Sequence, residues 1–209
     1  MRFKLQVHLP HYITNWFPLA VWRMPDDSKT LYLTFDDGPI PEVTPWVLET
    51  LATFNAHATF FCVGDNVNKN PDIYKQILDA GHRTGNHSFH HIKAWNTPKA
   101  IYMKDVSEAK GLINSHLFRP PHGQLTLQLL RTLRKDFSIV LWSLLSYDFD
   151  QSITPEKCLA ILIQYARAGD IVVFHDSLKA ESRMKYAFPK FLEYFHSKGF
   201  VFRAIPDNI

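Results

Sequence analysis

The chain has 209 residues, of which 46% are hydrophobic and 21% charged, with a formal net charge of +3. This balance is typical of a folded domain with a sizeable core and excludes an intrinsically disordered chain. The small net charge, without a run of Lys or Arg, excludes a nucleic-acid partner, and no protein partner is indicated. The two cysteines, Cys62 and Cys158, lack metal-ligand spacing and predict no disulfide framework.

The first 29 residues are expected to form a segment that packs on a catalytic domain of residues 30–209. Residues 5–22 contain no Asp, Glu, Lys or Arg, but His, Asn and Pro interrupt this run. Its longest apolar stretch, residues 17–22, is too short for a membrane span or a signal-peptide core. A cytoplasmic location is therefore favoured unless the chain was trimmed. The aromatic residues expected to pack across the domain are Trp16, Phe17 and Trp22.

Strand and helix signals alternate along the rest of the chain. Apolar runs predict strands near residues 30–35, 59–64, 82–86, 117–119, 137–143, 170–175 and 200–204. Two apolar helical faces lie between them, formed by Val43, Val47, Leu51 and Phe54 and by Tyr102, Val106, Ala109 and Ile113. Thr97-Pro98 and Thr154-Pro155 predict helix starts, with Thr as the N-cap. This alternation indicates a parallel sheet or barrel of βα units, and periodicity alone leaves both open.

Two adjacent carboxylates stand where the first predicted strand ends. Asp36 and Asp37 follow the apolar run of residues 31–35 and precede Gly38-Pro39, a pair that stops a strand. Two like charges this close raise each other's pKa unless a cation lies beside them. The pair therefore suggests a metal ligand next to a general base, and two solvated aspartates in a turn are the alternative interpretation.

A group of histidines follows another predicted strand. His87 and His91 are four residues apart, so a single turn brings both imidazoles to one ion. With Asp37 they make three N/O ligands and leave coordination positions open, which is the pattern of a catalytic metal site. Spacing alone also allows His90 in place of His91, and we prefer His91.

These motifs resemble those of the polysaccharide deacetylases, the NodB-homology domains of carbohydrate esterase family 4. Thr34-Phe35-Asp36-Asp37-Gly38 looks like the first motif and His87-Ser88-Phe89-His90-His91 like the second. The other three are represented, in order, by Arg119-Pro120-Pro121-His122-Gly123, by Trp142-Ser143 through Asp148-Phe149, and by Val173-Phe174-His175-Asp176. The resemblance implies a distorted, incomplete (β/α) barrel of about seven parallel strands.

The resemblance also implies a role for each motif residue. One divalent metal ion, zinc by preference and cobalt, nickel, manganese or iron as alternatives, would be held by Asp37, His87 and His91. Asp36 would act as the general base and His175 as the general acid. Arg119 would hold Asp36, and Asp148 would support the imidazolium of His175. The residues expected to meet the substrate or its oxyanion are His122, through its backbone N–H, together with Pro121, Phe149 and Val173.

Three positions depart from the family pattern. His122 replaces a Tyr or Phe, Phe149 replaces a Trp, and Leu145 stands where the family often has an acidic residue. None of the three is a metal ligand, the base or the acid. We expect them to change substrate choice more than catalysis.

The function implied is a metal-dependent hydrolase that removes N-acetyl groups from a GlcNAc-containing glycan, chitooligosaccharide or peptidoglycan-like. An O-acetyl esterase acting on a polysaccharide and a catalytically impaired, metal-bound glycan-binding protein are the alternatives. A non-haem iron oxygenase also uses two histidines and one carboxylate, but it leaves Asp36 and His175 without a task. An acetylated glycan or amino sugar is the expected partner.

Overall fold

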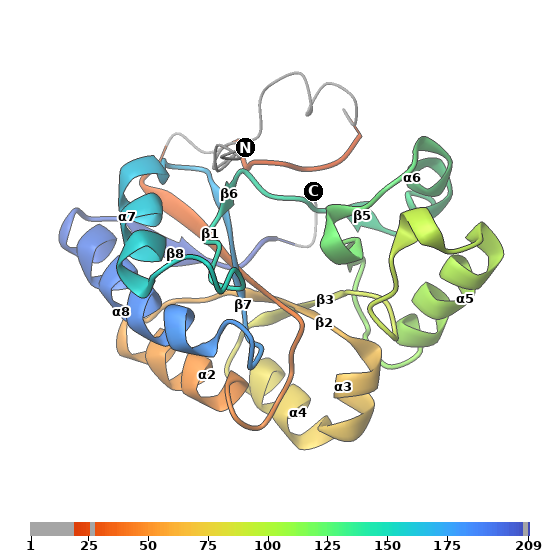
Figure 1. Cartoon of the computed structure of the whole chain (residues 1–209), viewed down its shortest axis with the longest axis horizontal. Helices are drawn as coiled ribbons and strands as arrows, with labels where there is room; N and C mark the ends of the chain where they lie inside the picture. Colours follow the sequence, from red (N-terminus) through yellow and green to blue (C-terminus); the bar gives the residue numbers. More distant parts are fainter. Residues whose placement is uncertain (1–18, 26–27, 207–208) are drawn as a thin grey trace.

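The computed structural model describes residues 19–25, 28–206 and 209, and it shows helices around the outer side of a curled sheet (Figure 1). The strands of this sheet are β1 (Thr30–Asp36), β2 (Thr59–Cys62), β3 (Arg83–Asn86), β4 (Leu117–Phe118), β5 (Ser138–Ile139), β6 (Leu144–Leu145), β7 (Ile171–His175) and β8 (Val201–Arg203). Seven of them follow the order β5-β4-β3-β2-β1-β7-β6, and every pair is parallel. The predicted barrel of about seven parallel strands is confirmed.

Strand β1 runs through the middle of the sheet. Its residue Tyr32 pairs with Ile171 of β7 and with Arg203 of β8, so these two strands lie on opposite sides of β1. Strand β2 pairs with the later part of β1, residues 34–36, on the side away from β7. All seven residues of β1 are buried, which explains its apolar and threonine-rich sequence and fixes the position of Asp36 at its end.

The helices connect successive strands and cover the outer side of the sheet (Figure 1). They are α2 (Thr44–Thr53), α3 (Gly64–Lys69), α4 (Pro71–Asp79), α5 (Lys99–Lys110), α6 (Leu127–Leu133), α7 (Pro155–Tyr165) and α8 (Glu181–Ser197), with the short 3₁₀ turns η1 (Ala94–Asn96) and η2 (Pro121–Gly123).

In the core, the ring of Phe35 stacks on Phe60 and Phe174 and meets Phe188 of α8 edge-on. Burial of such rings is a large favourable contribution to folding.

The predicted strand over residues 137–143 is wrong in its extent. The chain there forms β5 at one edge of the sheet and then crosses to β6 at the other edge. During the crossing Val140 N bonds to the carbonyl of Phe118, and Ser143 N bonds to that of Ile171. The carbonyls of Val140 and Leu141 accept hydrogen bonds from Arg119 instead of from a neighbouring strand. An apolar run cannot reveal such a change of partner.

The two helix starts predicted from Thr-Pro pairs have different outcomes. Thr154 caps α7 as expected, because its hydroxyl accepts a hydrogen bond from Lys157 N. Thr97 does not cap α5, which begins at Lys99 with Pro98 in the N-cap position. The Thr97 hydroxyl donates instead to the carbonyl of Lys93, so it belongs to the preceding turn.

Residues 19–25, which the structure describes, lie against the strands and the chain between β5 and β6. Val21 forms a parallel bridge with Val140, and Arg23 an antiparallel bridge with Asp170. Trp22 is half-buried beside the core cluster of α5 and α6, whereas the other two aromatic residues expected to pack here, Trp16 and Phe17, lie outside the described residues. Within the described part of the chain, no helix has the length and apolar composition needed to cross a bilayer.

Candidate active site

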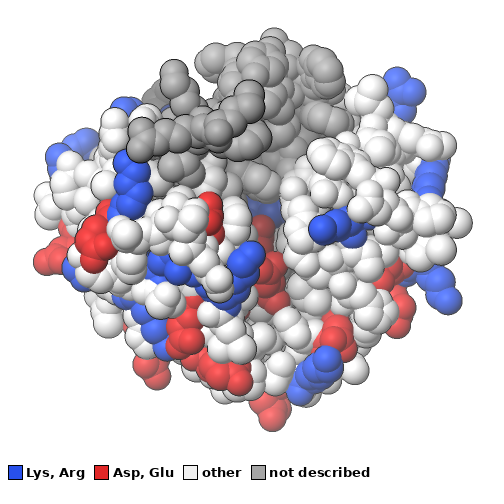
Figure 2. Space-filling view, viewed as in Figure 1, with Lys and Arg blue, Asp and Glu red and all other residues white. Residues whose placement is uncertain are grey.

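A cavity of about 410 Å³ opens at the carboxyl ends of the strands. In the space-filling view the face is hollowed near its centre, with acidic side chains in the depth of the hollow (Figure 2). The lining residues come from all five sequence motifs and from the loop after β7: Asp36, Asp37, His87, His91, His122, Gly123, Trp142, Leu145, Phe149, Val173, His175 and Lys179. Parallel βα folds build their active sites at this end of the sheet.

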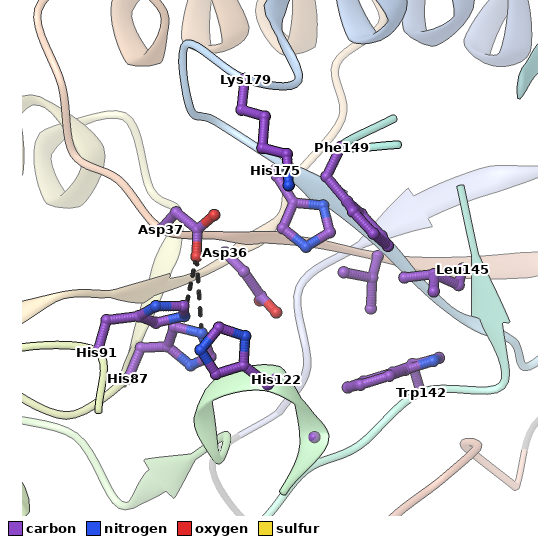
Figure 3. A pocket seen from close by; sticks show the side chains of 12 residues that line it. Asp36, Asp37, His87, His91, His122, Trp142, Leu145, Phe149, His175 and Lys179 are labelled. Atoms are coloured by element: carbon purple, nitrogen blue, oxygen red, sulfur yellow. Dashed lines mark ion pairs between the residues drawn. The ribbon is translucent and has the colours of Figure 1, made fainter. Parts of the chain in front are cut away.

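Asp37, His87 and His91 converge on one side of the cavity (Figure 3). The carboxylate Oδ1 of Asp37 lies 3.3 Å from Nε2 of His91 and 3.9 Å from Nε2 of His87. One donor atom from each residue falls within 4.8 Å of the other two. Two imidazoles and one carboxylate are donors that a divalent ion such as zinc accepts, and three protein ligands leave a position open.

The protonation of His87 suits metal binding. Its Nδ1 lies 2.8 Å from the backbone carbonyl of Arg119, an atom that only accepts, so Nδ1 holds the proton and Nε2 is free to coordinate. Burial lowers the pKa of His87 to about 4, against the opposing effect of Asp36 and Asp37. The ring is therefore neutral at pH 7, which is the form that binds metals.

His90 points away from this group. Its Nδ1 lies 2.6 Å from Oδ1 of Asp105 on α5, and Oδ2 of the same carboxylate accepts hydrogen bonds from the backbone N–H of Phe89 and His90. Asp105 thereby fixes the turn that separates His87 from His91. Of the two histidines that spacing allowed, the structure brings His91 to Asp37.

The turn after the aspartate pair is held by Asp176, the last residue of the fifth motif. Its Oδ1 accepts from Gly38 N at 3.0 Å, and its Oδ2 accepts from the Thr44 hydroxyl at 2.6 Å. A Cβ atom at Gly38 would come within 1.9 Å of this carboxylate, so only glycine fits there. Burial raises the pKa of Asp176 to about 7, although both hydrogen bonds lower it.

Arg119 lies fully buried beneath Asp36. Its guanidinium donates to Oδ1 of Asp36 at 2.6 Å and to the Thr34 hydroxyl at 2.8 Å. Its remaining hydrogen bonds go to backbone carbonyls after β5, and its plane lies over the ring of Phe61 at 4.1 Å. Asp36 is thus paired with a cation and only its edge reaches the cavity.

His175 and Asp148 form a second charge pair across the cavity from His87 and His91 (Figure 3). Nδ1 of His175 lies 2.7 Å from Oδ1 of Asp148, and the backbone N–H of His175 donates to Oδ2. Burial alone would lower the pKa of His175, but the charge and hydrogen bond of Asp148, with smaller effects of Asp37 and Asp36, raise it to about 9. His175 is accordingly a cation at neutral pH with its other nitrogen available to the cavity.

The remaining walls are largely aromatic and apolar (Figure 3). His122 stands beside His91 with ring centroids 4.5 Å apart, in the left-handed backbone region with φ 58°. Phe149 meets the His175 ring edge-on, and Leu145 and Val173 lie on the same wall as Trp142. Pro121, which was expected to meet the substrate, is buried as the first residue of η2 and is not among the residues that line the cavity.

Three residues that line the cavity had no expected role from the sequence: Gly123, Trp142 and Lys179. Trp142 opens the fourth motif, and Gly123 of the third motif approaches its ring so closely that a Cβ there would come within 2.6 Å. Lys179 belongs to no motif. Its position in the loop after β7 could have predicted that it lines the cavity, because such loops line the sites of parallel βα folds.

Residues 23–136, more than half of the chain, match the family model described as polysaccharide deacetylase. The chain belongs to the polysaccharide deacetylase family. This membership agrees with the order of the five motifs and with the site geometry, and it confirms the predicted enzyme class, a hydrolase, over an iron oxygenase.

The relatives of this chain include bacterial peptidoglycan deacetylases. A peptidoglycan-N-acetylglucosamine deacetylase of Bacillus cereus is 33% identical over 195 residues, which cover 90% of this chain and 92% of the relative. The peptidoglycan-N-acetylmuramic acid deacetylase PdaA of Bacillus subtilis is 30% identical, with 86% and 71% covered. The crystal structure of the Bc1960 peptidoglycan N-acetylglucosamine deacetylase, bound to a substituted N-oxidanyl-benzamide, superposes with a TM-score of 0.86 at 26% identity, covering 92% and 94%.

Proposed function

We propose that this protein is a metal-dependent deacetylase that hydrolyses the N-acetyl groups of a GlcNAc-containing glycan. The supporting observation is that two adjacent aspartates at the end of β1 have separate partners. Asp37 faces His87 and His91, whereas Asp36 is paired with Arg119. Hydrolysis of an acetamide needs both a group that polarises the carbonyl and a base that deprotonates water, and the pair of aspartates provides for both.

Asp37, His87 and His91 would hold one divalent ion, for which zinc is our preferred identity. Two neutral imidazoles and one carboxylate with an open position are the ligand set of catalytic zinc, and cobalt, nickel, manganese and iron accept the same donors. When bound, such an ion polarises a carbonyl oxygen and lowers the pKa of water.

Asp36 would act as the general base. Its carboxylate lines the cavity beside Asp37, and Arg119 holds its other edge at 2.6 Å, so that one oxygen is fixed and the other side faces the reacting groups. It would accept a proton from the water that attacks the acetyl carbon. The backbone N–H of His122 would stabilise the resulting oxyanion, because η2 presents this residue next to the ligand side of the cavity.

His175 would act as the general acid. A raised pKa of about 9 keeps its ring protonated at neutral pH, and Asp148 holds the ring through Nδ1, leaving Nε2 to donate. The proton would pass to the departing amine of the sugar as the C–N bond breaks. Asp148 is buried and contacts only the protein side of the ring, so it would orient and charge His175 without touching the substrate.

The substrate would be an acetylated glycan or amino sugar, as the names of the relatives suggest. The acetyl-bearing unit would lie between the walls of Phe149, Leu145 and Val173 and the side chain of His122. We further propose that residues 30–209 form the catalytic domain and residues 1–29 a segment packed on it. The burial of Ala20 and Met24 supports this division.

The test is acetate release from a panel of acetylated glycans, with the protein first stripped of metal and then supplied with zinc. We expect release from N-acetylated oligosaccharides only after zinc is restored, and loss of release in Asp36→Asn at unchanged zinc content. Release from O-acetylated polysaccharide alone would replace the amide assignment by an esterase. Oligosaccharide binding without any acetate release would favour a catalytically impaired binding protein.

A further inference from the structure

Lys179 is a cation on the cavity wall that the proposed chemistry does not use. It lies between β7 and α8, four residues after His175. Its backbone carbonyl accepts a hydrogen bond from Arg183, and its Nζ stands 5.6 Å from the centroid of the Phe149 ring. The side chain extends toward the cavity next to His175 (Figure 3). An aromatic face holds an ammonium group by cation–π attraction and restricts where it points.

The other cations of the site have partners of opposite charge. Arg119 is paired with Asp36 at 2.6 Å and His175 with Asp148 at 2.7 Å, whereas Asp37 faces the candidate metal position together with His87 and His91. Among the residues that the structure describes, no carboxylate forms an ion pair with Lys179. Its charge is therefore available to a ligand in the cavity.

Asp150 is an acidic group whose pKa the charge of Lys179 affects. The pKa of Asp150 is lowered chiefly by hydrogen bonds from Ser152, and Lys179 makes only a small contribution. Both Ser152 N and its hydroxyl donate to Oδ1 of Asp150, at 2.9 and 2.7 Å. Asp150 is thus committed to its own turn and stays beyond ion-pair distance of the lysine.

We propose that Lys179 binds a carboxylate of the substrate, and that the enzyme therefore prefers amino-sugar chains in which a carboxylate lies close to the acetamido group. This inference rests on the proposed function and names its substrate class. The ammonium group of Lys179 supplies one positive charge, which matches the single negative charge of a carboxylate. The ring of Phe149 contacts both the Lys179 ammonium and the His175 ring, so it places the lysine beside the proposed general acid.

A purely surface role for Lys179 is the competing explanation. An exposed lysine near a site attracts any anion from a distance, and that effect depends on charge and not on position within the cavity. Lys93 provides the matched control, because its charge also reaches His122 but its side chain does not line the cavity. General attraction predicts equal effects of the two lysines, whereas a bound carboxylate predicts an effect of Lys179 alone.

The experiment compares one peptidoglycan-derived oligosaccharide bearing a free lactyl carboxylate with the same oligosaccharide as its methyl ester. The ratio of kcat/KM for acid over ester is measured with zinc-loaded wild type, Lys179→Gln, Lys179→Arg and Lys93→Gln. We expect Lys179→Gln to lower this ratio about fivefold, the size typical of a partly exposed ion pair. Lys179→Arg keeps the positive charge and should retain most of the acid-over-ester ratio. Lys93→Gln should have the same ratio as wild type.

Equilibrium binding of the acid and the ester separates this inference from the proposed function. A binding preference for the acid that Lys179→Gln removes would support the carboxylate site even if no acetate were released. Acetate release with an acid-to-ester ratio unchanged in Lys179→Gln would overturn the carboxylate site and leave the deacetylase in place. An equal loss in Lys93→Gln and Lys179→Gln would also overturn it, in favour of general attraction.

Discussion

The backbone carbonyl of Arg119 accepts the Nδ1 hydrogen bond of His87 at 2.8 Å. The side chain of the same arginine holds Asp36 at 2.6 Å. One buried residue therefore orients a metal-ligand candidate through its main chain and the base candidate through its guanidinium. Any displacement of β4 and its following loop would change both at once.

Removal of the Arg119 side chain should destabilise the fold as well as the site. Arg119→Met leaves Asp36 buried without its cation and also removes the donor to three further oxygens, the Thr34 hydroxyl and the carbonyls of Val140 and Leu141. Breaking a buried pair in this way costs about 3–5 kcal/mol. Denaturant unfolding should show a loss of this size, whereas Arg131→Met on the exposed face of α6 should change the free energy of unfolding by less than about 0.5 kcal/mol. Equal stability of the two variants would contradict the buried-pair account.

Neighbouring histidines should differ in metal binding. His91→Ala removes a donor that lies 3.3 Å from Asp37, so zinc content should fall strongly. His90→Ala removes a ring that is bound to Asp105 and should keep the zinc. Zinc per protein after dialysis, measured by elemental analysis, distinguishes the two. Full zinc retention in His91→Ala would require another ligand set.

Asp36→Asn should separate metal binding from turnover. The amide has nearly the shape of the carboxylate and Asp37 is untouched, so zinc content should stay normal. Loss of the base should reduce kcat about 10²–10⁴-fold, the usual contribution of positioned base catalysis. Near-normal turnover in this variant would show that the two aspartates do not have distinct tasks.

The alkaline limit of activity should depend on Asp148. Because Asp148 raises the pKa of His175 to about 9, activity should decline as pH rises through this value. Asp148→Asn removes the charge and should move the decline to lower pH.

The same pair affects folding. A histidine whose pKa is raised above 6.5 stabilises the folded state fully below pH 6.5, and this stabilisation is lost as pH rises through about 9.

This linkage is measurable without turnover. Unfolding of the metal-free protein by denaturant at pH 6 and at pH 10 should show a larger pH-dependent loss of stability in wild type than in Asp148→Asn. The two outcomes are independent checks on one pair of residues. If the alkaline limit of activity lies at the same pH in wild type and in Asp148→Asn, His175 is not the general acid.

Local sequence patterns predicted much of the fold and the candidate site because their signals are short-range. The apolar runs gave the strand positions, and the motifs gave the side chains that end up at the carboxyl ends of those strands. The choice between His90 and His91 depended on Asp105, a contact fifteen residues away that spacing does not encode. The crossing from β5 to β6 depended on Arg119 taking two backbone carbonyls, and Lys179 enters the cavity only through the path of the loop after β7.

The central position of β1 in the sheet determines how the protein loses activity on heating. This strand has partners on both sides and no exposed residue, so its amide hydrogens should exchange with solvent only when the whole domain opens. Asp36 and Asp37 stand at the end of this most protected strand. The aspartate pair should therefore persist until global unfolding, and inactivation by heat should follow the same transition as loss of the sheet.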